Sequence, residues 1–283
     1  MTYGDYMSGS DVVLSVAPTA PEHTREDASL PVTPDAIAEQ VADCATQGAT
    51  IASVYGWTAD GAQSPSALPD VATEIRDRTT DVLIEYAVGP ECPLGDYLAA
   101  LDSRPHPDLA QLRITPTQYG QRGATRRTRK DVDSFIEELT ARNIKPNLLI
   151  QGGRDVQELY RLLQADMVTD PLVTLRLGAR DGTVATPLTL MALVEALPSS
   201  ASVLVAATGP NQYPLTTMAV FLGANVRTGM ADNRYLAHED PVVHNEQLVR
   251  RVTEVVSQSE RALADYATVK SDLTPEKRRV ESS

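Results

Sequence analysis

Residues 131–177 read DVDSFIEELTARNIKPNLLIQGGRDVQELYRLLQADMVTDPLVTLRL, and this stretch decides the fold class. Apolar side chains recur at helical spacing over residues 131–142 and again over 156–163, which predicts two amphipathic helices. Each helix is followed by a short apolar run of strand length, at residues 145–150 and 172–177. Strands separated by helices usually pair in parallel. The stretch therefore predicts two successive units of an α/β fold.

The same alternation continues on both sides of this stretch. Further strands are expected at residues 12–16, 49–55, 81–86, 109–114, 202–206 and 224–227. Further helices are expected at residues 33–48, 71–76, 97–101, 186–197, 215–222 and 245–264. Eight strands that alternate with eight helices favour a closed (β/α)8 TIM barrel. The alternative is an open doubly wound sheet, but no GxGxxG motif follows the first strand.

We expect a single barrel domain over residues 1–283, with short disordered ends at residues 1–10 and 274–283. Both ends are rich in polar side chains. The sequence contains two cysteines, Cys44 and Cys92, which are too few for a disulfide framework. Its four histidines are not spaced as neighbouring metal ligands on one strand or helix face.

The charge balance restricts the class of partner. Lys and Arg number 25 and Asp and Glu number 38, which gives a formal net charge of −13. Non-specific binding to nucleic acid needs clustered cations, and an anionic membrane repels an acidic chain. No apolar run reaches the roughly 18 residues of a transmembrane helix, and the first residues lack a secretory signal pattern. We therefore expect a cytoplasmic protein with a small-molecule substrate and no nucleic-acid or membrane partner.

The chemistry of a barrel gathers at the carboxyl ends of its strands and in the loops that follow them. The densest polar segment at such a position is Arg227-Thr-Gly-Met-Ala-Asp-Asn233, directly after the last predicted strand. Arg227 could hold a substrate carboxylate or enolate, and Asp232 could act as the catalytic base. The same spacing also fits a structural Arg–Asp bridge that only holds the loop.

Other side chains near the strand ends are candidates for substrate binding. They are Thr19, Tyr55, Trp57, Thr115, Thr117, Asn211 and Asn233. Trp57 is the only tryptophan and could either line the mouth of the barrel or pack in the core. Glu85 lies within a predicted strand, and the pattern does not decide whether its side chain points into the barrel or toward the helices.

Several motifs also carry a resemblance to a known family. They are Ala17-Pro-Thr-Ala-Pro-Glu-His-Thr, Leu30-Pro-Val-Thr-Pro-Asp-Ala-Ile-Ala-Glu39, the stretch from Leu177-Gly178 to Thr186-Pro187, Gly223-Ala-Asn-Val-Arg-Thr-Gly-Met-Ala-Asp-Asn233, and Asn245-Glu-Gln-Leu-Val249. Together they resemble the β-keto acid cleavage enzymes, whose founding activity is 3-keto-5-aminohexanoate cleavage. The resemblance extends over nearly the whole chain.

This resemblance implies a (β/α)8 barrel that usually forms a homotetramer, so we expect a homo-oligomer, a tetramer or a dimer. It also implies a divalent metal, typically zinc, that holds and polarises a β-keto acid. An Asp after the eighth strand is the family's base, with an Arg nearby, and Asp232 and Arg227 match these positions. The family condenses its substrate with acetyl-CoA and splits it by a retro-Claisen step into acetoacetate and a new acyl-CoA.

The chain departs from the family at the metal ligands. These are two His residues of an HxH pair and the Glu of a GLEDN motif, and the matching positions here are Ser53, Tyr55 and Ala231. A hydroxyl, a phenol and a methyl group cannot replace two imidazoles and a carboxylate as zinc ligands. We therefore expect no metal cofactor, and hydrogen-bond donors such as Tyr55, Trp57 and Arg227 in place of the Lewis acid. Acetyl-CoA remains a candidate co-substrate whose use this change calls into question.

Three functions are then open. The first is a metal-independent enzyme of C–C bond or enolate chemistry (a lyase, a condensing or a cyclising enzyme), such as a specialised biosynthetic pathway would use. The second is a non-catalytic, ligand-binding descendant of the barrel. The third is the family's zinc-dependent reaction with a relocated metal, held by Glu22 and His23 after the first strand.

Overall fold

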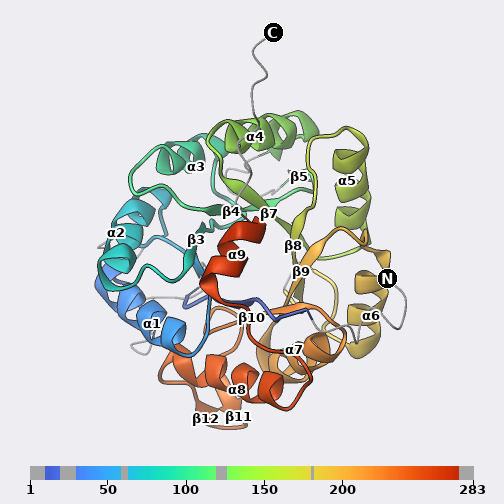
Figure 1. The fold of residues 1–283 in the computed structure, drawn as a ribbon. Coiled ribbons are helices and arrows are strands. Elements are labelled where there is room, and N and C mark those ends of the chain that lie inside the picture. Colours follow the sequence, from blue (N-terminus) through green and yellow to red (C-terminus); the bar gives the residue numbers. More distant parts are fainter. Residues whose placement is uncertain (1–9, 20–29, 59–62, 119–125, 180–181, 274–283) are drawn as a thin grey trace.

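Eight parallel strands close into a barrel in the computed structural model, as the sequence predicts (Figure 1). The strand order around the barrel is β1-β10-β9-β8-β7-β4-β3-β2. The strands are β1 (Leu14–Val16), β2 (Ile51–Val54), β3 (Leu83–Tyr86), β4 (Leu109–Arg113), β7 (Lys145–Ile150), β8 (Leu172–Leu177), β9 (Ser202–Ala207) and β10 (Asn225–Thr228). The structure describes residues 10–19, 30–58, 63–118, 126–179 and 182–273. Of the predicted disordered ends, residues 1–9 and 274–283 lie outside the described residues, and Ser10 is exposed.

Helices surround the barrel and connect its strands (Figure 1). They are α1 (Pro34–Thr46), α2 (Leu68–Arg78), α3 (Leu94–Leu101), α4 (Arg129–Ala141), α5 (Gly153–Gln164), α6 (Pro187–Ala196), α7 (Gln212–Phe221) and α8 (Asn245–Ser257), with short 3-10 turns η1 (Pro65–Ala67) and η2 (Gly209–Asn211). Local chemistry sets where several of them begin. The side chains of Thr33, Thr128 and Thr186 cap α1, α4 and α6 by accepting a hydrogen bond from a backbone N–H of the first turn.

Side chains along the barrel strands alternate between the helix layer and the barrel interior. Outward-facing residues such as Val54, Ile84 and Leu175 pack with the helices in the main apolar cluster. Inward-facing residues at the amino ends of the strands form a second apolar cluster, which includes Ile51, Leu83, Leu109, Leu172 and Leu204. Two residues further along, the inward positions of four of these strands are polar, and β9 has Ala206 there: the polar residues are Ser53, Glu85, Gln111 and Thr174. The barrel therefore has an apolar floor and a polar interior toward its mouth.

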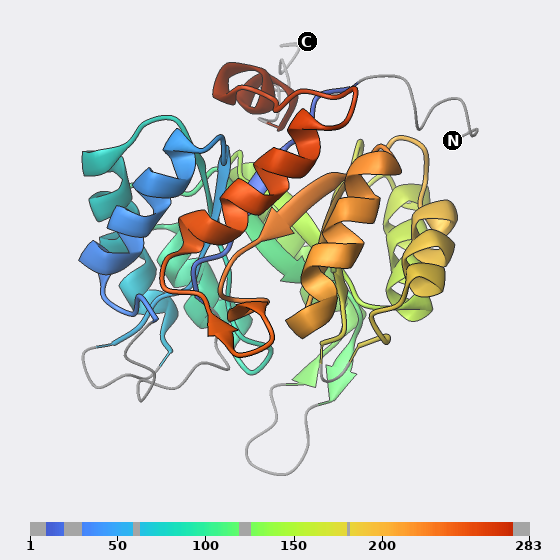
Figure 2. The same ribbon diagram turned by 90° about the horizontal axis from the view of Figure 1, so that it is seen from below.

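A helix that the sequence did not predict closes the floor. α9 (Tyr266–Leu273) contributes Val269 and Leu273 to the inward-facing apolar cluster. It lies across the centre of the strand ring in Figure 1, and at one end of the barrel in Figure 2. The hairpins β5 (Thr117–Gln118)–β6 (Arg126–Arg127) and β11 (Tyr235–Ala237)–β12 (Asp240–Pro241) lie at the opposite end (Figure 2). No helix in the described part of the chain is both long enough and apolar enough to cross a membrane.

The predicted helix over residues 245–264 was wrong at its carboxyl end. α8 stops at Ser257 because the chain then runs in extended form beside the start of β1. The backbone N–H of Val12 donates to the carbonyl of Ala262 at 2.7 Å, and the N–H of Ala264 donates to the carbonyl of Val12 at 3.0 Å. Arg261 fixes this segment by donating to the carbonyls of Val220 and Ala224.

Candidate active site

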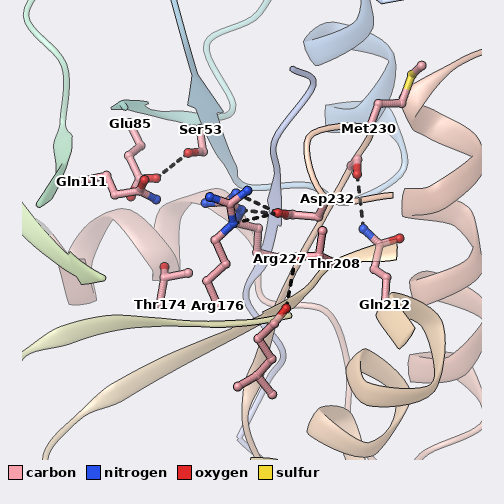
Figure 3. Close-up of polar contacts among 12 residues, drawn as sticks. Ser53, Glu85, Gln111, Thr174, Arg176, Thr208, Gln212, Arg227, Met230 and Asp232 are labelled. Atoms are coloured by element: carbon pink, nitrogen blue, oxygen red, sulfur yellow. Dashed lines mark hydrogen bonds and ion pairs between the residues drawn. The ribbon is translucent and has the colours of Figure 1, made fainter. Parts of the chain in front are cut away.

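Arg227 and Asp232 meet inside the mouth of the barrel (Figure 3). The Arg227 Nε donates to Asp232 Oδ2 at 3.1 Å, and its Nη2 donates to Oδ1 at 3.2 Å. The two side chains are 1% and 0% exposed. A planar guanidinium that meets both oxygens of a carboxylate is the strongest common form of ion pair in proteins. The geometry thus brings together the two residues that the sequence proposed as binding group and base.

The backbone after β10 turns sharply to return Asp232 toward Arg227. Gly229 has φ of 136°, a conformation that other residues rarely adopt, and a Cβ there would collide with the carbonyl of Ala17. The carbonyl of Gly229 accepts from the N–H groups of Asp232 and Asn233, both at 3.1 Å. The carbonyl of Asp232 in turn accepts from Gly209 N–H at 2.7 Å. The position of the carboxylate is therefore fixed by the loops after β1 and β9 as well as by its own.

A second arginine reaches the same carboxylate. Arg176 lies on β8, its Nε is 3.4 Å from Asp232 Oδ1, and its side chain is 9% exposed. Figure 3 shows the guanidinium groups of Arg176 and Arg227 both directed at Asp232. β8 and β10 are separated only by β9, where Ala206 pairs with Arg176. Because Val226 pairs with Val205, Arg227 is also in step with Ala206, and this small side chain leaves room for two guanidinium groups.

The charge of Arg227 is well stabilised despite its burial. Burial lowers the pKa of the guanidinium, but the neighbouring Asp232, Tyr55 and Glu85 outweigh it, so the pKa is raised above its ordinary value. Arg227 therefore keeps its positive charge inside the mouth of the barrel. An anionic ligand or a developing negative charge would be favoured beside it.

Glu85 points into the barrel and forms the centre of a polar network (Figure 3). It accepts hydrogen bonds from the hydroxyl of Ser53 at 2.5 Å and from the side-chain amide of Asn147. The hydroxyl of Thr174 donates to the amide oxygen of Asn147 at 3.0 Å. Burial raises the pKa of Glu85, and the hydrogen bonds from Ser53 and Asn147 together with the charge of Arg227 offset this only in part.

Replacement of Glu85 by Gln is expected to remove a pH-dependent loss of stability. Because the pKa of Glu85 is raised on folding, the folded state holds this proton more tightly than the unfolded chain does. Below the ordinary pKa of 4.5 the group contributes fully to wild-type stability, and that contribution is lost as the pH rises through the raised pKa. The free energy of unfolding of the wild type minus that of Glu85→Gln should therefore fall as the pH rises above 4.5, in urea titrations over a pH series. Glu138→Gln, at a partly exposed side chain, is the control. A difference in unfolding free energy between the wild type and Glu85→Gln that stays constant or rises with pH would contradict the prediction.

The positions that correspond to the family's metal ligands do not form a zinc site. The hydroxyl of Ser53 is bonded to Glu85, and the phenol of Tyr55 donates to the amide oxygen of Gln111 at 3.5 Å. Tyr55 and Ala231 are buried together in a small cluster with Ala17 and Ala87. A methyl group, an engaged hydroxyl and a phenol packed among alanines are not the donor set that zinc requires. The residues present therefore do not fit the metal.

Within the part of the chain that the structure describes, no group of three or more His, Cys, Asp or Glu side chains could hold a metal ion. Glu22 and His23, the alternative ligands proposed from the sequence, lie outside the described residues.

The remaining predicted substrate-binding residues lie in different surroundings. Thr19 is fully buried, and the hydroxyl of Thr115 donates to the carboxylate of Asp155. Trp57 is 5% exposed and packs in the main apolar cluster. Asn211 is exposed at the end of η2.

Asn233 makes hydrogen bonds to the backbone of Tyr235 through both ends of its side-chain amide, at 2.7 and 3.2 Å. It also lines a cavity of about 570 Å³ between η2, α7, α8 and the β11–β12 hairpin. The backbone of Thr117 belongs to β5, but its side chain lies outside the described residues.

The sequence did not single out Arg176, which the structure adds to the site. A signal existed in β8 itself, because a charged residue stands inside the apolar run LVTLRL and is buried there. Buried charges in proteins are nearly always paired, so such a residue points to a partner elsewhere in the barrel. Gln111 of β4, which receives the Tyr55 phenol, was also not predicted.

Comparisons with known proteins show the family of this chain and its similarity to several enzymes. The family described as beta-keto acid cleavage enzyme matches residues 11–274. The chain is 24% identical over 257 residues to a 3-keto-5-aminohexanoate cleavage enzyme of Acetoanaerobium sticklandii, with 89% of this chain and 94% of that protein covered. It is also 24% identical over 273 residues to a 3-dehydrocarnitine:acetyl-CoA trimethylamine transferase of Rhizobium meliloti, with 87% and 90% covered.

Among solved structures, the apo structure of ObcA is similar with a TM-score of 0.69 and 15% sequence identity. The match covers 87% of this chain, which spans 65% of the length of ObcA. At this level of identity the similarity shows a shared barrel fold alone.

Proposed function

The chain belongs to the beta-keto acid cleavage enzyme family, and we propose that it is an enzyme of this family that works without a metal ion. Its substrate is a small molecule that carries a carbonyl group and a carboxylate. The reaction is C–C bond or enolate chemistry, as a cleavage, a condensation or a cyclisation. The proposal rests on one observation, the buried Asp232 carboxylate held in the mouth of the barrel by guanidinium groups, beside positions that no longer offer zinc ligands.

In the proposed mechanism Asp232 acts as the base. Its carboxylate takes a proton from the carbon beside the substrate carbonyl, which leaves an enolate. The permanent charge of Arg227 and the phenol of Tyr55 stabilise the negative charge on the enolate oxygen. Because these donors are buried and fixed, they need little rearrangement when the charge develops. Acetyl-CoA is the candidate co-substrate, since one relative carries it in its name.

Exhaustive treatment with a chelator is expected to leave the activity of the enzyme unchanged. The assay would follow acetoacetate and longer 3-oxo acids by mass spectrometry, with and without acetyl-CoA, before and after dialysis against dipicolinate. Because the residues at the family's metal positions do not fit zinc, the rates before and after dialysis should agree within about twofold. Removal of a catalytic Lewis acid would cause a far larger loss of rate, because such an ion supplies several kcal/mol of transition-state stabilisation. Loss of activity on chelation with recovery on addition of zinc would overturn metal independence.

The proposal includes a homo-oligomer, a tetramer or a dimer, for which α6 provides support. Leu188 and Met191 on this helix are 78% and 50% exposed, and Val184 just before it is 67% exposed. Neighbouring exposed apolar side chains on a water-soluble protein often mark a contact with another chain.

A further inference from the structure

The cavity that Asn233 lines is separate from the Arg227–Asp232 pair. Its volume of about 570 Å³ is within the range of cavities that bind small organic molecules. Among the described residues, its walls come from η2, α7, α8 and the segment from Asn233 through the β11–β12 hairpin, and Arg227 and Asp232 are not part of them. Figure 1 shows α7, α8 and this hairpin beside one another on one side of the barrel. The cavity is therefore a candidate for a second ligand site.

Arg251 of α8 presents a positive charge to this cavity. Its half-buried guanidinium lies 3.7 Å from the ring centroid of Tyr213, and its Nη1 donates to the carbonyl of Leu236 at 2.7 Å. Within the described part of the chain, no carboxylate forms an ion pair with it, and its Nε and Nη2 donate to no residue. The neighbouring Arg250, in contrast, pairs with Glu246 at 3.1 Å. A ring and a carbonyl thus hold the guanidinium of Arg251 in place while two of its nitrogens remain available to an anion.

The other charged groups of the cavity lie at its rim. His238 and Glu239, in the turn of the hairpin, are 93% and 86% exposed, and His238 Nδ1 is 4.0 Å from Glu239 Oε1. Water and salt screen a carboxylate that is so exposed, so it offsets the charge of Arg251 only weakly. The remaining lining residues that the structure describes are uncharged. Arg251 is therefore the dominant charge of the cavity.

The walls of the cavity are otherwise largely apolar and aromatic. The residues that form them are Pro210, Tyr213, Pro214, Tyr235, Leu236 and Ala237. Tyr213 and Tyr235 are 38% and 54% exposed. Exposed apolar side chains that gather around a hollow often mark a ligand-binding groove. An aromatic ring packs well against such walls, and an anionic group attached to it can pair with the guanidinium.

We infer that this cavity binds a small aromatic carboxylate. Arg251 binds the carboxylate, and Tyr213 and Tyr235 pack against the ring. The inference goes beyond the proposed function, because the site does not include the base Asp232 and its ligand does not need to react.

An aromatic carboxylate fits the cavity better than a nucleotide, which also combines a ring with an anion. A phosphate monoester carries about 1.5 to 2 negative charges at neutral pH, whereas the cavity offers one dominant cation on a chain with a net charge of −13. The ribose hydroxyls of a nucleotide would also need polar partners. The walls offer few of them, because the side-chain amide of Asn233 is already bonded to the backbone of Tyr235.

Titration calorimetry of the intact protein tests the inference without requiring turnover. The probes are phenylacetate, indole-3-acetate, the neutral amides of both, acetate, and adenosine monophosphate, at constant ionic strength. The wild type should bind at least one aromatic carboxylate saturably, and bind it about 10-fold or more tighter than its amide, acetate or the nucleotide, as expected for one charged hydrogen-bonding partner. Arg251→Met should weaken binding of that carboxylate by about 10-fold or more. Tyr213→Leu should also weaken it, whereas Tyr213→Phe keeps the ring and should bind as the wild type does.

Arg250→Met is the matched control, because Arg250 precedes Arg251 on α8 and pairs with Glu246. It should bind the aromatic carboxylate as the wild type does. If Arg251→Met does not fold, Arg251→Gln, which keeps a polar side chain without the charge, decides the question by the same loss of affinity. Unchanged affinity in the Arg251 variants, tighter binding of an amide or of the nucleotide, or binding of neither aromatic carboxylate overturns the inference.

Discussion

Replacement of Asp232 by Asn is expected to lower kcat/KM by about 10²–10⁴-fold, the range that a general base contributes to a proton transfer. The amide keeps the size of the side chain but cannot accept a proton from carbon. It also weakens the ion pairs with Arg227 and Arg176, which now hold the carboxylate in place. The measurement is a steady-state assay on whichever 3-oxo acid the wild type turns over fastest.

Two further variants separate loss of the base from loss of folding. Asp133→Asn removes a carboxylate that pairs with Arg161 outside the barrel, and it should keep wild-type activity. Asp232→Glu keeps a base on a longer arm and should recover part of the rate. A wild-type rate in Asp232→Asn would leave Arg227 and Asp232 as a structural bridge. Absence of turnover by the wild type on every 3-oxo acid tested would instead favour a non-catalytic, ligand-binding descendant of the barrel.

The barrel was predictable because each of its units repeats the same local pattern. Residues 145–150 and 172–177 are strands at the boundaries that the sequence predicts, since short apolar runs between amphipathic helices leave few alternatives. β1 is shorter than predicted because Val12 pairs with Leu263 in an isolated bridge. α9 was missed because it buries only Val269 and Leu273, which is too little to produce a helical pattern.

The direction of individual side chains could not be predicted in the same way. Strands of a parallel barrel are buried on both faces, so apolar residues occupy both sides. The sequence of such a strand therefore does not show which of its alternating side chains face the interior. Glu85 and Arg176 are inward-facing residues of two such strands, and only the closed sheet shows that both point to the interior. Arg227 and Asp232 were easier to find, because they lie close together in one segment after a strand.

Replacement of Arg227 by Met is expected to lower the free energy of unfolding by about 3–5 kcal/mol, the cost of removing one partner from a buried ion pair. Arg227 and Asp232 are 1% and 0% exposed, so their ion pair is shielded from water. Arg176 would remain 3.4 Å from the carboxylate and should hold the loss near the lower value. Urea titrations at neutral pH measure the change.

The double variant Arg227→Met with Asp232→Asn should be less destabilised than the sum of the two single variants, because it removes the buried charge together with its partner. Arg161→Met provides the comparison, since Arg161 is 27% exposed, its partner Asp133 is 30% exposed, and its second partner Glu158 keeps an ion pair with Arg129. Its removal should therefore cost only about 1 kcal/mol. If Arg227→Met were no more destabilised than Arg161→Met, the buried pair would add little to folding. Its geometry would then be maintained for ligand binding rather than for the stability of the barrel.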